Sequence, residues 1–360
     1  MGLLFFIAGL ALLVLGGELL VRGASRLAGA LGIPRLIIGL TVVAFGTSSP
    51  ELAVSVKSAL TGSADIALGN VVGSNIFNVL FILGLSALIT PLVCSVRLLR
   101  LDVPLMVLFS VIVLVLALDH RVGRFDGLFL LASLLVYVAF LIVQGRREPA
   151  DVQGEFDQAF GEERSGGRGT LANIALVAFG LVLLVVGSRW LVQSATDFAQ
   201  RLGVSELVVG LTIVAAGTSL PEVVTSIVAA LRGERDIAVG NVIGSNLFNI
   251  MGVLGAAAVV APEGIGVTPA VIGFDLPVMI VVAAACLPVF FTGGDISRLE
   301  GAILFVYYIA YTTYLVLYAT GHDALPEFSL VMVAFVTPLT LLILGILVWQ
   351  EVQRRRARPP

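Results

Sequence analysis

The sequence predicts an all-α polytopic membrane protein, built from two inverted five-helix repeats and an extra C-terminal helix. Three observations support this fold class. The 360 residues are 58% hydrophobic and only 12% charged, about half the charge of an average soluble domain. Eleven apolar runs of about 18–25 residues are each long enough to cross a bilayer as a helix. About 25 of the 40 positions in 39–78 recur identically in 210–249 at one constant shift, an internal symmetry typical of transporters.

The eleven apolar runs form two sets of five and one further run. The first set lies in a first repeat, residues 1–144, and covers 3–23, 36–60, 66–92, 101–119 and 125–144. The second set lies in an inverted repeat, residues 170–320, and covers 171–195, 207–231, 237–261, 269–291 and 299–320. Polar, Gly-rich residues 145–169 are expected to form a cytoplasmic linker. Residues 321–360 are expected to hold the eleventh transmembrane helix, 328–350, and a basic cytoplasmic tail.

The number of helices in a repeat determines how its copy enters the membrane. Because five is odd, the second repeat must be inserted upside down, with a two-fold axis in the membrane plane. With the N-terminus outside, about 16 Arg residues fall in inside loops and about five Arg or Lys residues fall outside, as the positive-inside rule requires. We therefore predict a multi-pass protein of the cell (inner) membrane, with its N-terminus outside and its C-terminus in the cytoplasm.

Two spans are expected to be broken in their middle. Pro50 lacks an N–H group, so the carbonyl of Gly46 loses its helical partner, and residues 217–222 repeat this arrangement. Freed carbonyls are tolerated at membrane depth only where they are buried in protein or line a cavity. A proline or serine alone would more often be a packing device, but two carboxylates at matching mid-span positions indicate a functional site. The two carboxylates are those of Glu51 and Glu222.

The polar side chains near these glutamates recur at helical spacing. On the broken helices, residues three or four apart share one face: Thr47, Ser48 and Glu51, and in the second copy Thr218, Ser219 and Glu222. The following helices add Ser74, Asn78, Ser245 and Asn249. All these side chains offer oxygen, so Ca²⁺, Na⁺, Mg²⁺ or H⁺ fit them better than copper or zinc. For Asn75 and Asn246 we expect interhelical hydrogen bonds instead, and the stripes Gly69/Gly73 and Gly240/Gly244 are expected to admit a close neighbouring helix.

The motif Gly-Thr-Ser-x-Pro-Glu followed by Gly-Ser-Asn-x-Phe-Asn occurs in two copies, at 46–51 with 73–78 and at 217–222 with 244–249. It resembles the inverted α-repeats of the sodium/calcium exchanger family, within the cation/calcium exchanger superfamily, and the chain looks like a prokaryotic member. The resemblance implies a ten-helix core over about 3–320, in which the first and sixth helices slide past the other eight. It also implies calcium coordination by the two glutamates with the backbone of Thr47 and Thr218. The sodium sites it implies add Ala44, Ser48, Ser74, Ala215, Ser219 and Ser245.

The chain departs from this family in two ways. Many members carry an aspartate in the second repeat where this chain has Asn249, whereas Asn78 matches the usual asparagine. The central site is then expected to have only two formal charges, which argues against potassium-dependent exchange. The eleventh helix lies outside the ten-helix core and could serve as a packing or dimer element.

We predict a secondary active antiporter that exchanges Ca²⁺ for Na⁺ by alternating access at a midplane site. Calcium and sodium are expected as transported ions, with no organic cofactor, no nucleic acid, and only inorganic cations and the lipid bilayer as partners. No sequence feature supports an oligomer. Antiport of H⁺ against Ca²⁺ by the same glutamates stays open, and a cation channel is disfavoured by the inverted repeat. An enzyme is not expected, because no nucleophile–base pair or His cluster is present.

Overall fold

The computed structural model describes residues 2–62, 64–93, 95, 97–145, 167–201, 215–291 and 295–357. Within these residues, nine helices are long and apolar enough to cross a membrane, and one bent pair of helices forms a tenth span. They correspond to ten of the eleven predicted runs. The remaining run, 207–231, is described only from residue 215 onward, so its first part lies outside the described residues. Most of the predicted linker, 145–169, lies outside them as well.

The first repeat contains five helical spans and two short strands. Its first span is the long helix α1 (Gly2–Leu31), and its last is α8 (Arg124–Gly145). The spans between are composite, with α-helical and π-helical segments in series: α2 (Arg35–Ile38), η1 (Gly39–Val43), α3 (Ala44–Thr47) and α4 (Ser49–Leu60); α5 (Ala64–Phe77), η2 (Asn78–Leu83) and α6 (Gly84–Ile89); η3 (Leu98–Asp102), α7 (Val103–Leu116) and the 3₁₀ turn η4 (Ala117–Asp119). The strands are β1 (Leu92–Val93) and β2 (Arg121–Val122).

The second repeat follows the same order. It begins with the long helix α10 (Gly167–Arg201) and ends with α17 (Arg298–Ala319). The spans between consist of α12 (Ala215–Gly217) and α13 (Leu220–Leu231); α14 (Arg235–Phe248), η6 (Asn249–Val253) and α15 (Leu254–Val260); η7 (Val271–Asp275) and α16 (Leu276–Phe291). The strands are β3 (Ile265–Gly266) and β4 (Asp295–Ile296).

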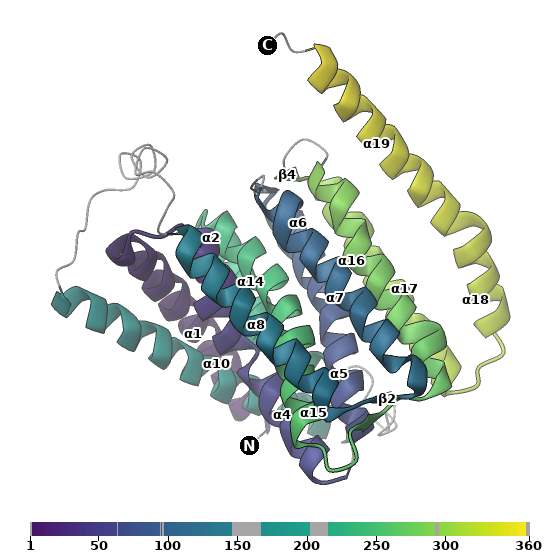
Figure 1. Cartoon of the computed structure of the whole chain (residues 1–360), viewed down its shortest axis with the longest axis horizontal. Helices are drawn as coiled ribbons and strands as arrows, with labels where there is room; N and C mark the ends of the chain where they lie inside the picture. Colours follow the sequence, from purple (N-terminus) through teal and green to yellow (C-terminus); the bar gives the residue numbers. More distant parts are fainter. Residues whose placement is uncertain are drawn as a thin grey trace.

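The short strands show that the repeats are inverted. Strand β1 pairs antiparallel with β4, and β2 pairs antiparallel with β3, so each pair joins a loop of one repeat to a loop of the other. The repeat maps β1 onto β3 and β2 onto β4, which exchanges the two pairs. They lie at opposite ends of the bundle, β4 near the top and β2 near the bottom of Figure 1. A two-fold axis across the bundle relates the repeats, as predicted.

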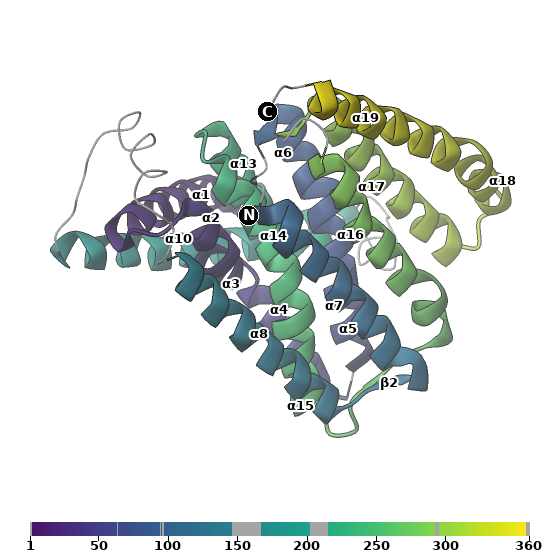
Figure 2. The ribbon, with the colours of Figure 1, turned by 45° about the horizontal axis from the view of Figure 1, so that its top comes forward.

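Helices α1 and α10 pack against each other through glycines. A Cβ atom on Gly16 would lie 2.8 Å from the Gly180 carbonyl oxygen, and one on Gly187 would lie 2.8 Å from that of Gly9. These close approaches put the two backbones in direct contact, as small residues allow in membrane helices. The pair lies side by side at the left edge of the bundle, at an angle to helices such as α8 (Figures 1 and 2). Both helices are longer than predicted, 30 and 35 residues, about 45 Å or more.

The final segment lies at the opposite edge of the bundle. It consists of α18 (Leu325–Val331), η8 (Met332–Val336) and α19 (Thr337–Ala357), drawn in yellow in Figures 1 and 2. Tyr307 on α17 donates a hydrogen bond of 2.9 Å to the hydroxyl of Thr340. Large apolar side chains of this segment, such as Phe335 and Leu342, are exposed, which is the pattern of a helix that faces lipid.

Candidate cation-binding site

Both broken helices are present. Helix Arg35–Thr47 and helix Ser49–Leu60 meet at Ser48 with a bend of 45°, where Ser48 has φ −80° and ψ 7°. In the second repeat, Ser219 has nearly the same conformation, φ −91° and ψ 9°, just before α13. A proline lies in the first turn of each following helix, where its missing N–H costs nothing. The proline therefore starts a new helix and interrupts the span, as predicted.

One of the freed carbonyls has a partner that sequence reasoning missed. Ser188 on α10 donates a hydrogen bond of 2.6 Å to the carbonyl oxygen of Gly217. The repeat shift places Gly17 at the matching position of α1, which has no hydroxyl to offer Gly46. This contact depends on α10 packing against the broken span, and no local sequence pattern shows which helix packs there.

Each glutamate is held by a serine of the opposite repeat. Ser48 Oγ donates to Glu222 Oε1 over 3.1 Å, and Ser219 Oγ donates to Glu51 Oε1 over 2.8 Å. Ser219 Oγ also lies 3.2 Å from the hydroxyl of Ser74, which can donate to it in turn. The four residues of the glutamate–serine pairs are fully buried, and each glutamate is bonded by the serine that lies three residues before the other glutamate. The two broken helices thus cross at one polar centre, with their acidic groups together.

Several oxygens of the predicted site residues are buried without a hydrogen-bond donor. They come from both repeats and form a nearly symmetric set: Glu51 Oε2, Glu222 Oε2, Asn78 Oδ1, Asn249 Oδ1 and Ser245 Oγ. A buried polar atom without a partner costs about 1–3 kcal/mol, so a set of acceptors like this fits a bound cation. Across the described ranges, no group of three or more Asp, Glu, His or Cys side chains is placed to hold a metal ion together. The donor set is therefore oxygen with two acids, which suits a hard cation.

Four buried asparagines link the helices of the two repeats. Asn78 Nδ2 donates to Asn246 Oδ1 over 3.0 Å, and Asn249 Nδ2 donates to Asn75 Oδ1 over 3.4 Å. The expected interhelical bonds of Asn75 and Asn246 are therefore present. The π-helical segments η2 and η6 begin at Asn78 and Asn249, and wide turns of this kind are frequent at functional sites.

The remaining predicted site residues lie on the elements that form the breaks. Ala44 and Thr47 are buried at the two ends of α3. Thr218 lies in the turn between α12 and α13 and is half-buried. Ala215 begins α12, and its side chain lies outside the described residues. The structure thus brings both copies of the motif to one centre.

The predicted glycine stripes can be checked in the second repeat only. A Cβ on Gly244 would lie 2.7 Å from the Cα of Leu40, and one on Gly240 would lie 3.0 Å from the Leu36 carbonyl oxygen. The predicted close approach is therefore confirmed there. By the repeat, the segment that would face Gly69 and Gly73 is 207–215, which lies almost entirely outside the described residues.

Two asparagines to which the sequence analysis gave no role form hydrogen bonds with the predicted site residues. Asn241 bonds to Thr47, Ser226 and the Glu222 carbonyl, and Asn70 repeats this pattern in the other half. Each lies four residues before a site serine, Ser74 or Ser245, and so on the same helical face. That spacing, and the occurrence of the same asparagine in both repeats, could have indicated a role for these two residues from the sequence.

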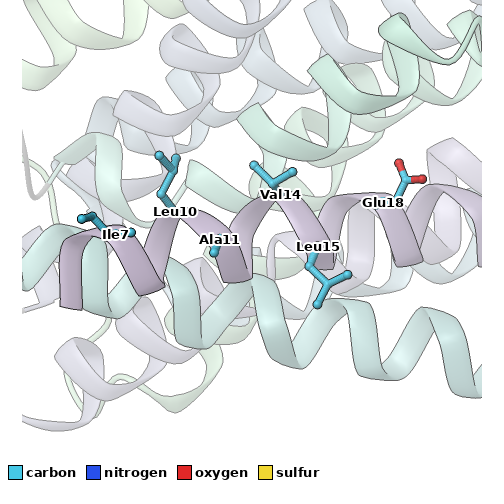
Figure 3. Close-up of a pocket in the computed structure, with 6 residues that line it drawn as sticks. All are labelled: Ile7, Leu10, Ala11, Val14, Leu15 and Glu18. Atoms are coloured by element: carbon cyan, nitrogen blue, oxygen red, sulfur yellow. The ribbon is translucent and has the colours of Figure 1, made fainter. Parts of the chain in front are cut away.

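An apolar groove on α1 lies apart from this centre. It has a volume of about 570 Å³ and is lined by Ile7, Leu10, Ala11, Val14, Leu15 and Glu18. Figure 3 shows Glu18 at one end of the row of apolar side chains. The Glu18 carboxylate forms ion pairs with Arg22, at 2.8 Å, and with Arg232. The groove offers no set of oxygen ligands, so it does not compete with the polar centre as a cation site.

Comparison with known proteins places this chain in one family. The family described as "Sodium/calcium exchanger protein" matches residues 1–143 and 172–317. The inner membrane protein YrbG of Escherichia coli (strain K12) is 42% identical over 284 residues, which cover 77% of this chain and 85% of that protein. The sodium/calcium exchanger MaX1 of Methanosarcina acetivorans is 34% identical over 339 residues, which cover 86% of this chain and 96% of that protein.

A solved structure agrees with these matches. The sodium-calcium exchanger NCX_Mj superposes with a TM-score of 0.74 at 29% identity, covering 86% of this chain and 96% of that one. The chain therefore belongs to the sodium/calcium exchanger family, as a multi-pass membrane transporter that exchanges cations including calcium and is not an enzyme.

Proposed function

We propose that this antiporter exchanges Ca²⁺ for Na⁺ at the centre between Glu51 and Glu222. The observation that carries the proposal is the pair of fully buried carboxylates, each with one oxygen that has no donor. Removing two charges from water costs several kcal/mol per ion unless they are compensated. One Ca²⁺ cancels both charges, and so do two Na⁺. A loaded centre can then close and cross the membrane, whereas an empty one cannot do so cheaply.

The proposed ligands are those that the resemblance to the family implies. The divalent ion is coordinated by the two glutamates and by the backbone carbonyls of Thr47 and Thr218. Sodium is proposed to use the glutamates with oxygens of Ala44, Ser48, Ser74, Ala215, Ser219 and Ser245. The side-chain oxygens of Asn78 and Asn249 add neutral donors to the centre. The relative MaX1 is named a sodium/calcium exchanger, and the structure of NCX_Mj was obtained with Na⁺ present, which supports sodium as the partner ion.

Alternating access is proposed to use the α1–α10 pair. These helices pack closely on each other through glycines, at the edge of the bundle, so they can move as one unit. Their motion past the other eight helices of the core would open the centre to one side at a time. We further propose the two-repeat division at 1–144 and 170–320, a cytoplasmic linker at 145–169, and the extra helix and tail at 321–360. The charge asymmetry of the loops supports an outside N-terminus and a cytoplasmic C-terminus.

The proposal is tested by radioactive calcium uptake into proteoliposomes. An outward Na⁺ gradient is expected to drive uptake several-fold above the rate without a gradient, and an imposed pH gradient or K⁺ gradient is expected to add little. Uptake driven by the pH gradient alone would instead assign the protein to H⁺/Ca²⁺ exchange. Single-channel currents in a planar bilayer would contradict an exchanger of either kind.

Changing Asn249 to aspartate is expected to alter the sodium requirement. Asn249→Asp places a third carboxylate in the centre, so one Ca²⁺ would leave a residual negative charge. Calcium transport should then need one more monovalent cation, seen as a steeper dependence of the rate on Na⁺ concentration or a new stimulation by K⁺. Asn78→Asp, at the mirror position, is expected to act in the same direction. An unchanged Na⁺ dependence and no K⁺ effect in both variants would contradict the charge argument.

A further inference from the structure

The side chain of Asn241 bridges the two repeats. Its amide nitrogen Nδ2 donates to the Ser226 hydroxyl over 2.9 Å and to the Glu222 carbonyl oxygen over 3.3 Å, both in its own repeat. Its oxygen Oδ1 accepts a hydrogen bond of 3.1 Å from the Thr47 hydroxyl of the other repeat. Asn241 is fully buried, so water does not compete for these three bonds. An amide is the side chain that can donate and accept in this way at once.

These contacts close a ring around one half of the centre. Thr47 is the last residue of α3, and its neighbour Ser48 binds the Glu222 carboxylate. Asn241 therefore binds the main chain of Glu222 directly. It also binds Thr47, the neighbour of Ser48, and Ser48 in turn binds the Glu222 carboxylate. The ring runs from Asn241 to Glu222, Ser48 and Thr47 and back to Asn241.

Asn70 forms the mirror ring in the other half. Its Nδ2 donates to the Ser55 hydroxyl over 3.0 Å and to the Glu51 carbonyl oxygen over 3.3 Å. Its Oδ1 accepts from the Thr218 hydroxyl over 3.5 Å, next to the Ser219 that binds Glu51. Two identical side chains in two inverted copies thus make the same three contacts, which a packing accident would not reproduce.

We propose that Asn70 and Asn241 are positioning residues that set the separation of the two glutamate half-sites and thereby favour Ca²⁺. A single Ca²⁺ needs six to eight oxygens at about 2.3–2.6 Å, so it must be reached from both half-sites at once. Sodium ions at separate subsites tolerate a wider separation of the half-sites. Loosening either ring therefore weakens calcium binding more than sodium binding. This inference rests on the proposed function of the centre.

The test is a double-mutant cycle on the purified full-length protein, measured by equilibrium binding of radioactive calcium. Thr47→Val keeps the shape and the backbone carbonyl of Thr47 and removes only its hydroxyl. Asn241→Leu keeps the approximate volume and removes all three bonds. Each change is expected to raise the calcium Kd about tenfold, as is usual for partners that orient metal ligands. Because both changes break one ring, the double variant should be little worse than Asn241→Leu alone.

Controls separate positioning from general damage. Thr41→Val makes the same change on the same span, where the Thr41 hydroxyl bonds the Ile37 carbonyl one turn earlier, and it is expected to keep the wild-type calcium Kd. Thr47→Ser, which retains a hydroxyl, should bind calcium more tightly than Thr47→Val. The Na⁺ concentration that displaces half of the calcium, corrected for each variant's own calcium Kd, gives the sodium affinity, which should change far less than the calcium Kd. The matching cycle of Asn70→Leu and Thr218→Val is expected to show the same pattern with smaller increases in the calcium Kd, because the hydrogen bond from Thr218 to Asn70 is longer than that from Thr47 to Asn241.

The outcomes distinguish the two levels of the account. Wild-type protein that neither binds nor carries calcium would refute the proposed function itself. If the wild type binds calcium, the positioning role fails when the losses in Thr47→Val and Asn241→Leu simply add. It also fails when Thr47→Val leaves the Kd unchanged, or when calcium and sodium affinities fall equally. Should Asn241→Leu not fold, Thr47→Val against Thr41→Val and Thr47→Ser still decides the question.

Discussion

Replacing Glu51 or Glu222 with glutamine is expected to reduce calcium transport on the order of 100-fold or more. At an effective dielectric constant of about 20, one unit charge about 4 Å from another is worth about 4 kcal/mol, and a divalent ion doubles this. Desolvation cancels part of that energy, but a loss of about 2.7 kcal/mol already corresponds to 100-fold. The rate of calcium uptake into proteoliposomes, at equal amounts of reconstituted protein, measures the effect.

The same glutamine variants are expected to be as stable as the wild type, or more so, without ions. Glutamine retains an oxygen that can accept from the Ser219 or Ser48 hydroxyl, and it removes one of two like charges buried together. The melting temperature in ion-free detergent should therefore not fall. Glu263→Gln, at an exposed position, is the matched control and should leave both transport and melting unchanged. A glutamine variant that transported calcium at the wild-type rate would contradict the charge mechanism.

Placing a methyl group in the α1–α10 contact is expected to damage both stability and transport. In Gly180→Ala, the new Cβ would lie 2.7 Å from the Leu20 amide nitrogen and 2.8 Å from the Gly16 carbonyl oxygen. Both are backbone atoms, so the helices themselves must separate. Overpacking of this kind typically costs about 1–3 kcal/mol, more than the gain of about 1 kcal/mol that alanine brings to a helix interior. We expect a lower melting temperature and a several-fold lower maximal transport rate.

Gly29 provides the control on the same helix pair. It lies on α1, and a Cβ there would have no neighbour within 4 Å among the described residues. Gly29→Ala is therefore expected to keep the wild-type transport rate and to melt at the same or a higher temperature. Equal behaviour of Gly180→Ala and Gly29→Ala would show that the glycine contact does not hold the pair together.

Much of the fold could be predicted because lipid leaves few solutions for the backbone. The apolar runs had to be helices, and a repeat with an odd number of helices had to be inverted in its second copy. Pro50 had to interrupt its span. The lengths of the first and sixth spans were underestimated, since α1 continues to Leu31, past the predicted end of the first run at residue 23. Charged residues such as Arg22 and Arg26 end the hydropathy signal but do not end a helix.

The contacts between helices were harder to predict, because spacing along one helix does not tell which helix faces it. The glycines of α1 recur every seven residues, at Gly9, Gly16 and Gly23. Their partners on α10 become evident only once the two helices are placed side by side. The ring of hydrogen bonds through Asn241 forms only where three separate segments meet, α3, α13 and α14. The repeated stretch 210–249 contains this residue, but only the structure distinguishes its role from that of Asn246.

Anomalous X-ray scattering from Sr²⁺, a calcium substitute, tests the central claim most directly. In crystals of the protein soaked with Sr²⁺, the account predicts one strong peak between the two broken helices, within coordination distance of carboxylate oxygens of both Glu51 and Glu222. A high Na⁺ concentration should remove that peak. Strontium bound elsewhere in the protein, with no peak between these two glutamates, would contradict the account.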